Sequence, residues 1–205
     1  MQSKIYLICN ERKIIKKMKT IFSKSFAILS LIVLAAFTTT ETKKVDTNKS
    51  IINWVGHKVT GQHEGTITLQ QGALEFSANQ LTGGNFVMDM TSINTTDLEG
   101  EYKNKLDGHL KADDFFGVET HKTAALVFTS VTKNGETYRV VGDLTIKDIT
   151  NEITFELAVS ENTASTTLQV DRTKYGIKYG SASFFDGLKD KAIYNEFDLT
   201  VSLKF

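Results

Sequence analysis

The side chains that could do chemistry in this chain are few and widely separated. The four histidines are His57, His63, His109 and His121. Their spacing matches no metal-binding pattern. The single cysteine, Cys9, excludes an internal disulfide and a cysteine-based zinc site. Two adjacent carboxylates, Asp113 and Asp114, fit a turn after a helix better than an acid–base pair.

Nothing in the sequence assembles into catalytic machinery. There is no nucleophile–base pattern, no phosphate-binding glycine loop and no Gly-x-Ser-x-Gly elbow. We therefore expect a protein that is not an enzyme and that uses no cofactor or metal. The chemistry that is left is the burial of apolar surface, worth about 25 cal/mol per Å².

Apolar side chains recur at every second position from Val45 to the end of the chain, which is the period of half-buried strands. In residues 153–159, for example, Ile, Phe, Leu and Val alternate with Thr, Glu and Ala. Turn signals such as Gly83-Gly84 and Asn134-Gly135 divide the chain into eight or nine predicted strands. This pattern indicates an antiparallel sandwich or a closed barrel.

One segment departs from the period of two. Over residues 97–110 apolar side chains recur every fourth position, which predicts a short amphipathic helix. Thr95, Thr96 or Asp97 could cap its first turn through a side-chain oxygen. A single helix beside a barrel would close one of its ends.

Residues 1–37 are expected to be an N-terminal extension plus a signal peptide. After Met18, two lysines precede an apolar run over residues 26–37, in the layout of a secretory signal. An apolar run of about a dozen residues is too short for an ordinary transmembrane helix, which needs about 20. We expect translation to start at Met18, with a genuine long basic leader as the alternative. The domain 38–205 would then be periplasmic or secreted, without a stable membrane anchor.

The composition of that domain restricts its partners. Residues 38–205 carry 17 Lys and Arg against 23 Asp and Glu, a net charge of −6. Such a domain lacks the positive charge that neutralises nucleic-acid phosphates, so no nucleic-acid partner is expected. The whole chain is 40% hydrophobic and 23% charged, which allows a full core and disfavours disorder.

Four stretches resemble the YceI-like family, and their order and spacing agree over residues 45–205. They are Val45-Asp46 through Asn53-Trp54, His109-Leu110-Lys111-Ala112-Asp113-Asp114-Phe115-Phe116, Phe128-Thr129-Ser130 with Val141–Ile146, and Asp171–Ile177. The chain departs from the family at Lys58, where histidine is frequent, and at Lys122 or Thr123, where proline is. The loop Ser181–Asn195 is also longer than in many members.

The resemblance implies an all-β, lipocalin-like antiparallel β-barrel of about eight strands with a short helix capping one end. It also implies a hydrophobic ligand, a long polyisoprenoid or isoprenoid-quinone-like amphiphile held in the barrel for transport, storage or scavenging. The expected ligand-binding residues are Trp54, Ile67, Phe76, Phe86, Met88, Met90, Leu126, Phe128, Leu144, Ile146, Phe155, Leu157, Leu168, Val170, Phe184, Phe185, Tyr194, Phe197 and Leu199.

Alternatives stay open at this point. The same side chains would give the same pattern in a barrel filled solid by its own core, as in a structural or stress-response protein without a ligand. A third hypothesis is an enzyme that acts on a lipid head group in the aromatic loop over residues 175–194. The aromatic side chains of that loop could grip a ligand at the open end of the barrel, or they could fold back onto the barrel and form a second, smaller core. A homodimer that shares one lipid is equally open.

Overall fold

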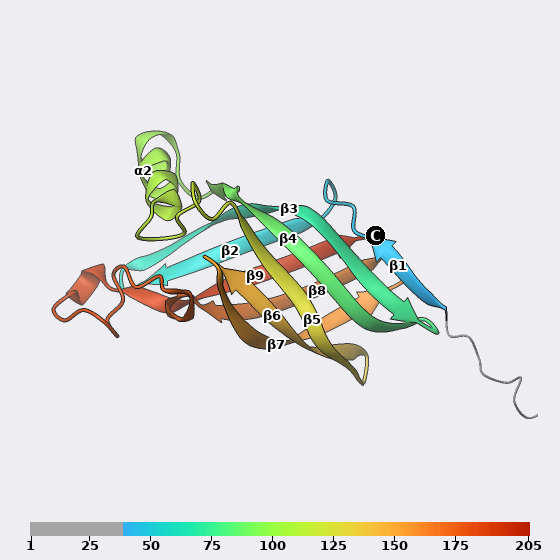
Figure 1. Ribbon diagram of the computed structural model, residues 1–205. Helices are drawn as coiled ribbons and strands as arrows, with labels where there is room; N and C mark the ends of the chain where they lie inside the picture. Colours follow the sequence, from blue (N-terminus) through green and yellow to red (C-terminus); the bar gives the residue numbers. More distant parts are fainter. Residues whose placement is uncertain (1–38) are drawn as a thin grey trace, which may run out of the picture. The chain divides into compact units, whose positions relative to one another are not determined.

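The computed structural model describes residues 39–205, so the expected signal peptide and the start at Met18 lie outside the described residues. The strands are β1 (Thr40–Lys44), β2 (Ile51–Lys58), β3 (Gly61–Ser77), β4 (Gln80–Thr95), β5 (Thr123–Asn134), β6 (Thr137–Ile146), β7 (Ile149–Ser160), β8 (Thr163–Asp171) and β9 (Ile193–Lys204). The helices are α2 (Gly100–Lys111) and two 3-10 helices, η1 (Arg172–Tyr175) and η2 (Lys189–Lys191). Figure 1 shows their arrangement.

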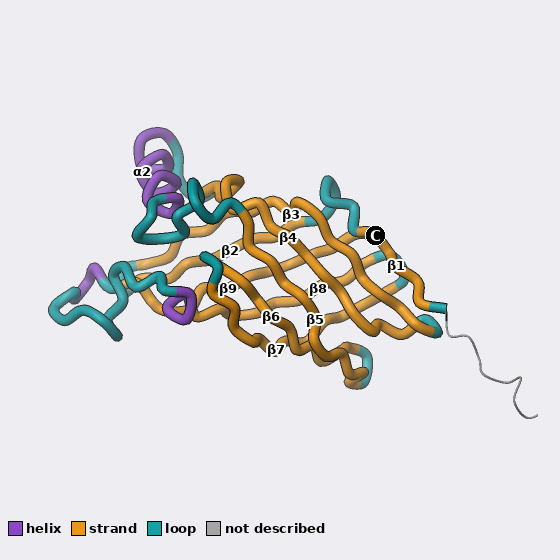
Figure 2. The backbone as a smooth tube through the Cα atoms, in the orientation of Figure 1, coloured by secondary structure: helices purple, strands orange, loops and turns teal. Residues whose placement is uncertain are grey.

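Eight antiparallel strands close into a barrel. Their order is β3-β2-β9-β8-β7-β6-β5-β4, and β4 returns to pair with β3. Strand β3 is 17 residues long, so its first half pairs with β2 while its last residues pair with β1. The fold is therefore the predicted lipocalin-like barrel with one short helix. All three helices gather at one end of it (Figure 2).

The period of two in the sequence becomes the inside and the outside of this barrel. In β6 the buried side chains Tyr138, Val140 and Leu144 alternate with exposed or half-buried ones such as Arg139. Neighbouring side chains on a strand point to opposite faces of the sheet, so one face of each strand lines the interior.

Backbone pairing is least complete between β7 and β8. Only three residue pairs join these strands, next to their hairpin turn, whereas ten join β6 to β7 and nine join β8 to β9. Beyond those three pairs the two strands separate. We call the unpaired stretch, residues 151–157 of β7 and 166–171 of β8, the β7–β8 seam.

Two side-chain hydrogen bonds hold the β7–β8 seam in place of a backbone ladder. The hydroxyl of Thr166 donates to the carbonyl of Glu156 at 2.7 Å. The amide of Asn151 donates to the carbonyl of Lys174 in η1 at 3.1 Å. The seam is thus bounded by the hairpin at one end and by η1 at the other.

Helix α2 begins three residues later than the start predicted at residue 97. The residue before it, Glu99, makes no side-chain cap. The expected cap Asp97 instead accepts the backbone N–H of Glu64 at 3.1 Å and lies 2.8 Å from the ring of His63. The prediction of a side-chain cap is wrong because this carboxylate fastens the chain to β3.

Lys103 and Asp107 of helix α2 form hydrogen bonds with Asn94 and Thr95 of β4, but the helix buries apolar surface against the barrel only in its last turn. Of the apolar stripe that predicted it, only Leu110 is buried, and Tyr102 is 75% exposed. The segment after the helix supplies the buried Phe115 and Val118. Closure of this end therefore depends on residues 110–118 more than on the body of the helix.

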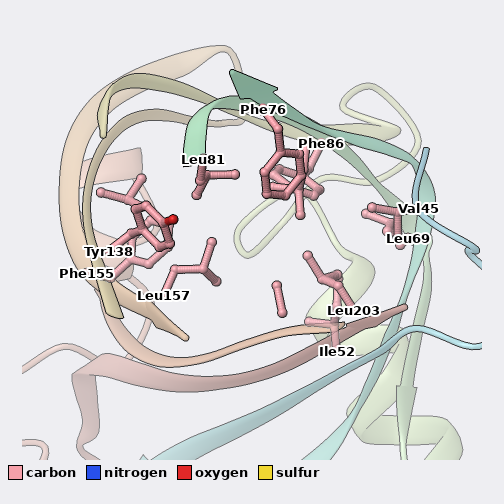
Figure 3. Close-up of a cluster of buried hydrophobic side chains, with 13 residues drawn as sticks. Val45, Ile52, Leu69, Phe76, Leu81, Phe86, Tyr138, Phe155, Leu157 and Leu203 are labelled. Atoms are coloured by element: carbon pink, nitrogen blue, oxygen red, sulfur yellow. The ribbon is translucent and has the colours of Figure 1, made fainter. Parts of the chain in front are cut away.

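Two clusters of buried side chains fill the two ends of the barrel interior. The first lies toward the β3–β4, β5–β6 and β7–β8 turns and includes Leu74, Leu81, Tyr138 and Leu157. In Figure 3 the labelled side chains of this cluster point inward from several strands. The second cluster lies at the helical end and includes Leu110, Phe115, Ile146, Tyr175 and Ile177.

Candidate ligand-binding cavity

A cavity of about 180 Å³ lies inside the barrel. That volume is far above the roughly 10–15 Å³ that one water molecule needs. Of its 28 lining residues, only Thr166 and Arg172 contribute a hydroxyl or a charge. Cavities lined this way favour hydrocarbon over water. A barrel filled solid by its own core, which the sequence left open, does not describe this interior.

Most of the predicted ligand-binding residues lie around this cavity. Fourteen of the nineteen line it, and all fourteen are on strands. They are Trp54, Ile67, Phe86, Met88, Met90, Leu126, Phe128, Leu144, Ile146, Phe155, Leu157, Leu168, Phe197 and Leu199.

The structure places the other five predicted residues away from the cavity lining. Phe76 is buried in the first cluster, 6.0 Å from the ring of Phe205, and Val170 is buried in the second. The remaining three are exposed on the chain between η1 and the start of β9; they are Phe184, Phe185 and Tyr194. Their exposure does not fit a second, smaller core, and a role in gripping a ligand at the mouth stays a prediction.

Fourteen lining residues were missing from the predicted set. They are Ile52, Gly56, Leu69, Ile93, Leu110, Phe115, Phe116, Ala124, Ile153, Thr166, Arg172, Ile193, Val201 and Leu203. Several lie two positions from a predicted residue on the same strand, as Ile52 does from Trp54 and Ile153 from Phe155, so the alternation could have found them. No apolar pattern points to Arg172.

Trp54 shows how the sheet makes room for a large wall residue. Its indole N–H donates to the carbonyl of Thr66 at 3.2 Å, which leaves the ring face for the cavity. Gly65 stands directly opposite it on β3. A methyl group at Gly65 would lie 2.5 Å from the indole ring, so glycine permits this packing.

Residues 112–118, which follow α2, are held by hydrogen bonds to backbone carbonyls. The N–H of Phe116 donates to the carbonyl of Leu110 at 3.1 Å, and Gly117 turns the chain at a φ of +57°. The ammonium of Lys147 donates to the carbonyl of Phe115 at 2.8 Å. These bonds hold the rings of Phe115 and Phe116 edge to face, with centroids 5.2 Å apart, against the end of the cavity.

Arg172 is a buried cation at the same end. It is only 2% exposed, and its guanidinium donates to three backbone carbonyls, those of Tyr194 at 3.0 Å, Ile177 at 2.8 Å and Ile193 at 3.1 Å. The charge also lies 5.6 Å from the ring centroid of Phe115. Five N–H groups belong to a guanidinium, so three of them are used here.

Burial lowers the pKa of Arg172, opposed in part by the charges of Asp171 and Glu196. Arginine nevertheless stays protonated in proteins. No carboxylate within residues 39–205 forms an ion pair with it. The site therefore places one permanent positive charge beside an apolar cavity.

Three histidines pair with single carboxylates on the outside of the barrel. His57 lies 2.8 Å from Asp198, and His121 lies 3.0 Å from Asp148. The third pair, His63 and Asp97, joins β3 to the segment before α2. No group of three or more potential metal ligands occurs in the part of the chain that the structure describes.

A closed antiparallel barrel around one apolar cavity defines a small-molecule binding barrel of the lipocalin-like kind. The family model described as the YceI-like domain matches residues 44–205. The chain belongs to the YceI-like family. No helix in residues 39–205 is long and apolar enough to cross a membrane.

Curated relatives are found in Staphylococcus aureus. A UPF0312 protein of the bovine strain RF122 / ET3-1 is 41% identical over 87 residues, which are 37% of this chain and 48% of the relative. A UPF0312 protein of strain USA300 is 40% identical over 104 residues, 45% of this chain and 54% of the relative. The chain spans about half the length of the curated relatives it matches.

Two solved structures share the fold. BcnA of Burkholderia cenocepacia superposes with a TM-score of 0.62 at 20% identity, covering 78% of this chain and 98% of BcnA. A polyisoprenoid binding domain from Saccharophagus degradans superposes with a TM-score of 0.54 at 15% identity, covering 80% and 97%. At these identities the likeness shows the fold alone.

Proposed function

We propose that this protein is an exported carrier that holds the tail of a polyisoprenoid or isoprenoid-quinone-like lipid inside its barrel. The observation that carries the proposal is the apolar cavity enclosed by the strands. The name of the Saccharophagus degradans domain, which has the same fold, supports the choice of ligand class. Export rests on the signal-like pattern of residues 1–37.

The walls of the cavity suit a flexible chain with branching methyl groups. Met88 and Met90 are unbranched and adaptable, so they follow an irregular surface. Three aromatic rings form a rigid strip that begins beside the methionines on β4, with 5.4 Å between the centroids of Phe86 and Phe128 and 5.9 Å between those of Phe128 and Phe155.

The free energy of burying the tail limits the affinity that a ligand can reach without other contacts. A tail of about ten carbons gains about 8 kcal/mol at about 0.8 kcal/mol per carbon. That gain corresponds to a Kd on the order of micromolar before the cost of ordering the chain. Tighter binding requires a longer tail or contacts to a polar head group.

Arg172 is the group that would orient such a head. Its side chain lines the cavity at the helical end and is the one charged side chain among the lining residues, so a phosphate or quinone oxygen would be attracted toward it. A buried, permanently charged guanidinium binds anionic oxygens better than a neutral donor does. The head would therefore lie toward the helical end and the tail toward the first buried cluster.

The same lining argues for binding without catalysis. Arg172 cannot accept a proton, and the hydroxyl of Thr166 is already donated to Glu156. Neither side chain offers a nucleophile with an adjacent base, so a lipid in this cavity meets no group that would transform it.

Extraction of the purified protein tests the proposal. An organic extract analysed by mass spectrometry is expected to contain an isoprenoid-type lipid. Protein stripped of that lipid is expected to take up an added polyprenyl quinone in equimolar amount. An empty extract together with no uptake of the quinone would overturn the carrier function and leave only the architecture.

A further inference from the structure

The loop between η1 and β9 gathers exposed aromatic side chains. In residues 39–205, four of the five exposed aromatic residues lie within this loop and the start of β9. They are Tyr179, Phe184, Phe185 and Tyr194, each about half exposed, at 46%, 47%, 51% and 53%. Apolar side chains exposed singly are ordinary, whereas a gathered set marks a contact surface. We call these four residues the aromatic tip.

Within the aromatic tip, Phe184 and Phe185 are positioned by a hydrogen-bonded turn. The carbonyl of fully buried Ser181 accepts the backbone N–H groups of both Phe184 and Phe185 at 3.1 Å. The hydroxyl of Ser181 lies 2.6 Å from the side-chain oxygen of Asn195, whose amide donates to Ser183 at 2.8 Å. The two phenylalanines are therefore presented to solvent by a built turn.

The charge around the aromatic tip differs from that of the rest of the domain. Residues 173–191, which follow the buried Arg172, hold four basic and two acidic residues, while residues 39–205 as a whole are acidic, with 17 basic and 23 acidic residues. The lysines of this loop are exposed, and the ammonium of Lys178 lies 4.8 Å from the ring centroid of Phe184. Positive charge and apolar rings thus share one surface on an otherwise negative molecule.

This combination fits the surface of an anionic lipid bilayer. Aromatic side chains bury their apolar part at the bilayer interface, and adjacent lysines attract anionic head groups. The loop is also continuous with the cavity, because Arg172 at its beginning and Ile193 at its end both line the cavity.

We propose that the aromatic tip docks this protein on anionic membranes by inserting Phe184 and Phe185 into the interface. The helical end of the barrel, where Arg172 lies, then faces the bilayer from which a prenyl lipid is taken. The docking surface is independent of the cavity, but its use in lipid loading rests on the proposed function. Two aromatic side chains and a few lysines give weak, reversible binding, which suits a carrier that must leave the membrane again.

Co-sedimentation with lipid vesicles tests the docking. The protein is expected to bind vesicles of phosphatidylglycerol and phosphatidylcholine more than vesicles of phosphatidylcholine alone, and to release as salt is raised. The double variant Phe184→Ala/Phe185→Ala is expected to bind anionic vesicles at least about tenfold more weakly than the parent. Tyr102→Ala, which removes a more exposed aromatic ring from α2, is the matched control and is expected to bind as the parent does.

Two results would overturn the docking proposal. One is absence of binding to anionic vesicles by the parent protein, and the other is parent-like binding by Phe184→Ala/Phe185→Ala. Sedimentation velocity measures whether the parent protein forms a dimer. If the parent is a dimer, the double variant is a monomer and neither binds vesicles, the aromatic tip is a protein interface and not a membrane-docking surface.

Uptake of a detergent-dispersed short-chain prenyl quinone, without vesicles, separates this proposal from the carrier function. The double variant is expected to take up the quinone as the parent does, because the aromatic tip does not line the cavity. Vesicle binding without any quinone uptake would sink the carrier function and leave docking intact. Quinone uptake without vesicle binding would do the reverse.

Discussion

Inside the barrel, a single side chain can decide whether a ligand fits. Met90 is buried and lines the 180 Å³ cavity, whereas Thr154 points outward from β7 and is exposed. Met90→Trp is expected to fill part of the cavity and to weaken prenyl-quinone binding about tenfold or more, at a cost of about 1–3 kcal/mol in stability from overpacking. Thr154→Trp is expected to bind as the parent does. Titration calorimetry measures both, and equal losses in the two variants would show that the inward face has been misassigned.

On the outer face, the pair of His57 and Asp198 ties β2 to β9. The hydrogen bond from His57 is the largest influence on the pKa of Asp198 and lowers it. A carboxylate with a lowered pKa stabilises the fold above the ordinary value of 3.8, and this contribution disappears as pH falls through the lowered pKa. Because the pair is partly solvated, Asp198→Asn is expected to lower the unfolding free energy by less than about 1 kcal/mol at pH 7. Urea titrations should show the difference vanishing as the pH falls through the lowered pKa of Asp198.

Among the elements, the alternation of the sequence identified the eight barrel strands and the inward face of most of them, but not β1, which precedes the alternating region. It failed at Phe76 and Val170, which follow the alternation and are buried but do not line the cavity. It also failed at Phe184 and Phe185, because a loop has no period from which a side-chain direction could be inferred. The start of α2 was misplaced since Asp97 found a partner on β3, a contact between distant segments that local propensity does not contain.

The β7–β8 seam predicts an uneven pattern of amide hydrogen exchange along β7. The carbonyl of Glu156 faces β8, and alternate residues of a strand face the same neighbour, so the backbone groups of Thr154 and Glu152 also face β8. Those of Phe155 and Ile153 face β6, with which β7 is fully paired. The amides of Thr154 and Glu152 are therefore expected to exchange much faster than those of Phe155 and Ile153 in NMR measurements. Uniform protection along β7 would contradict this account of the seam.

At the scale of the whole molecule, the presence of a cavity was beyond the sequence. Periodicity tells which way a side chain points but not how far it is from the opposite wall, and a solid core has the same alternation. Whether the interior is hollow depends on the width of the barrel, which all eight strands set together. It also depends on Leu110, Phe115 and Phe116, which close the helical end from a segment outside the sheet.

A ligand in this cavity should stabilise the entire barrel. At a free ligand concentration of about 100 times the Kd, binding to the folded state alone adds about 2.7 kcal/mol. For a domain of this size each kcal/mol raises Tm by about 2–4 °C, so a shift of roughly 5–11 °C is expected with a prenyl quinone. Calorimetry of the parent beside Met90→Trp measures it, and an equal shift in both would mean that the stabilising ligand binds elsewhere.

Along the β7–β8 seam the girth of the barrel is not fixed by a backbone ladder. Widening it there costs the two side-chain hydrogen bonds of Thr166 and Asn151, at about 1 kcal/mol each, and leaves the other ladders intact. The two buried clusters, by contrast, fix the depth of the cavity. Selection among lipids by this protein should consequently be lenient toward thick chains and strict toward the length of chain that can be enclosed.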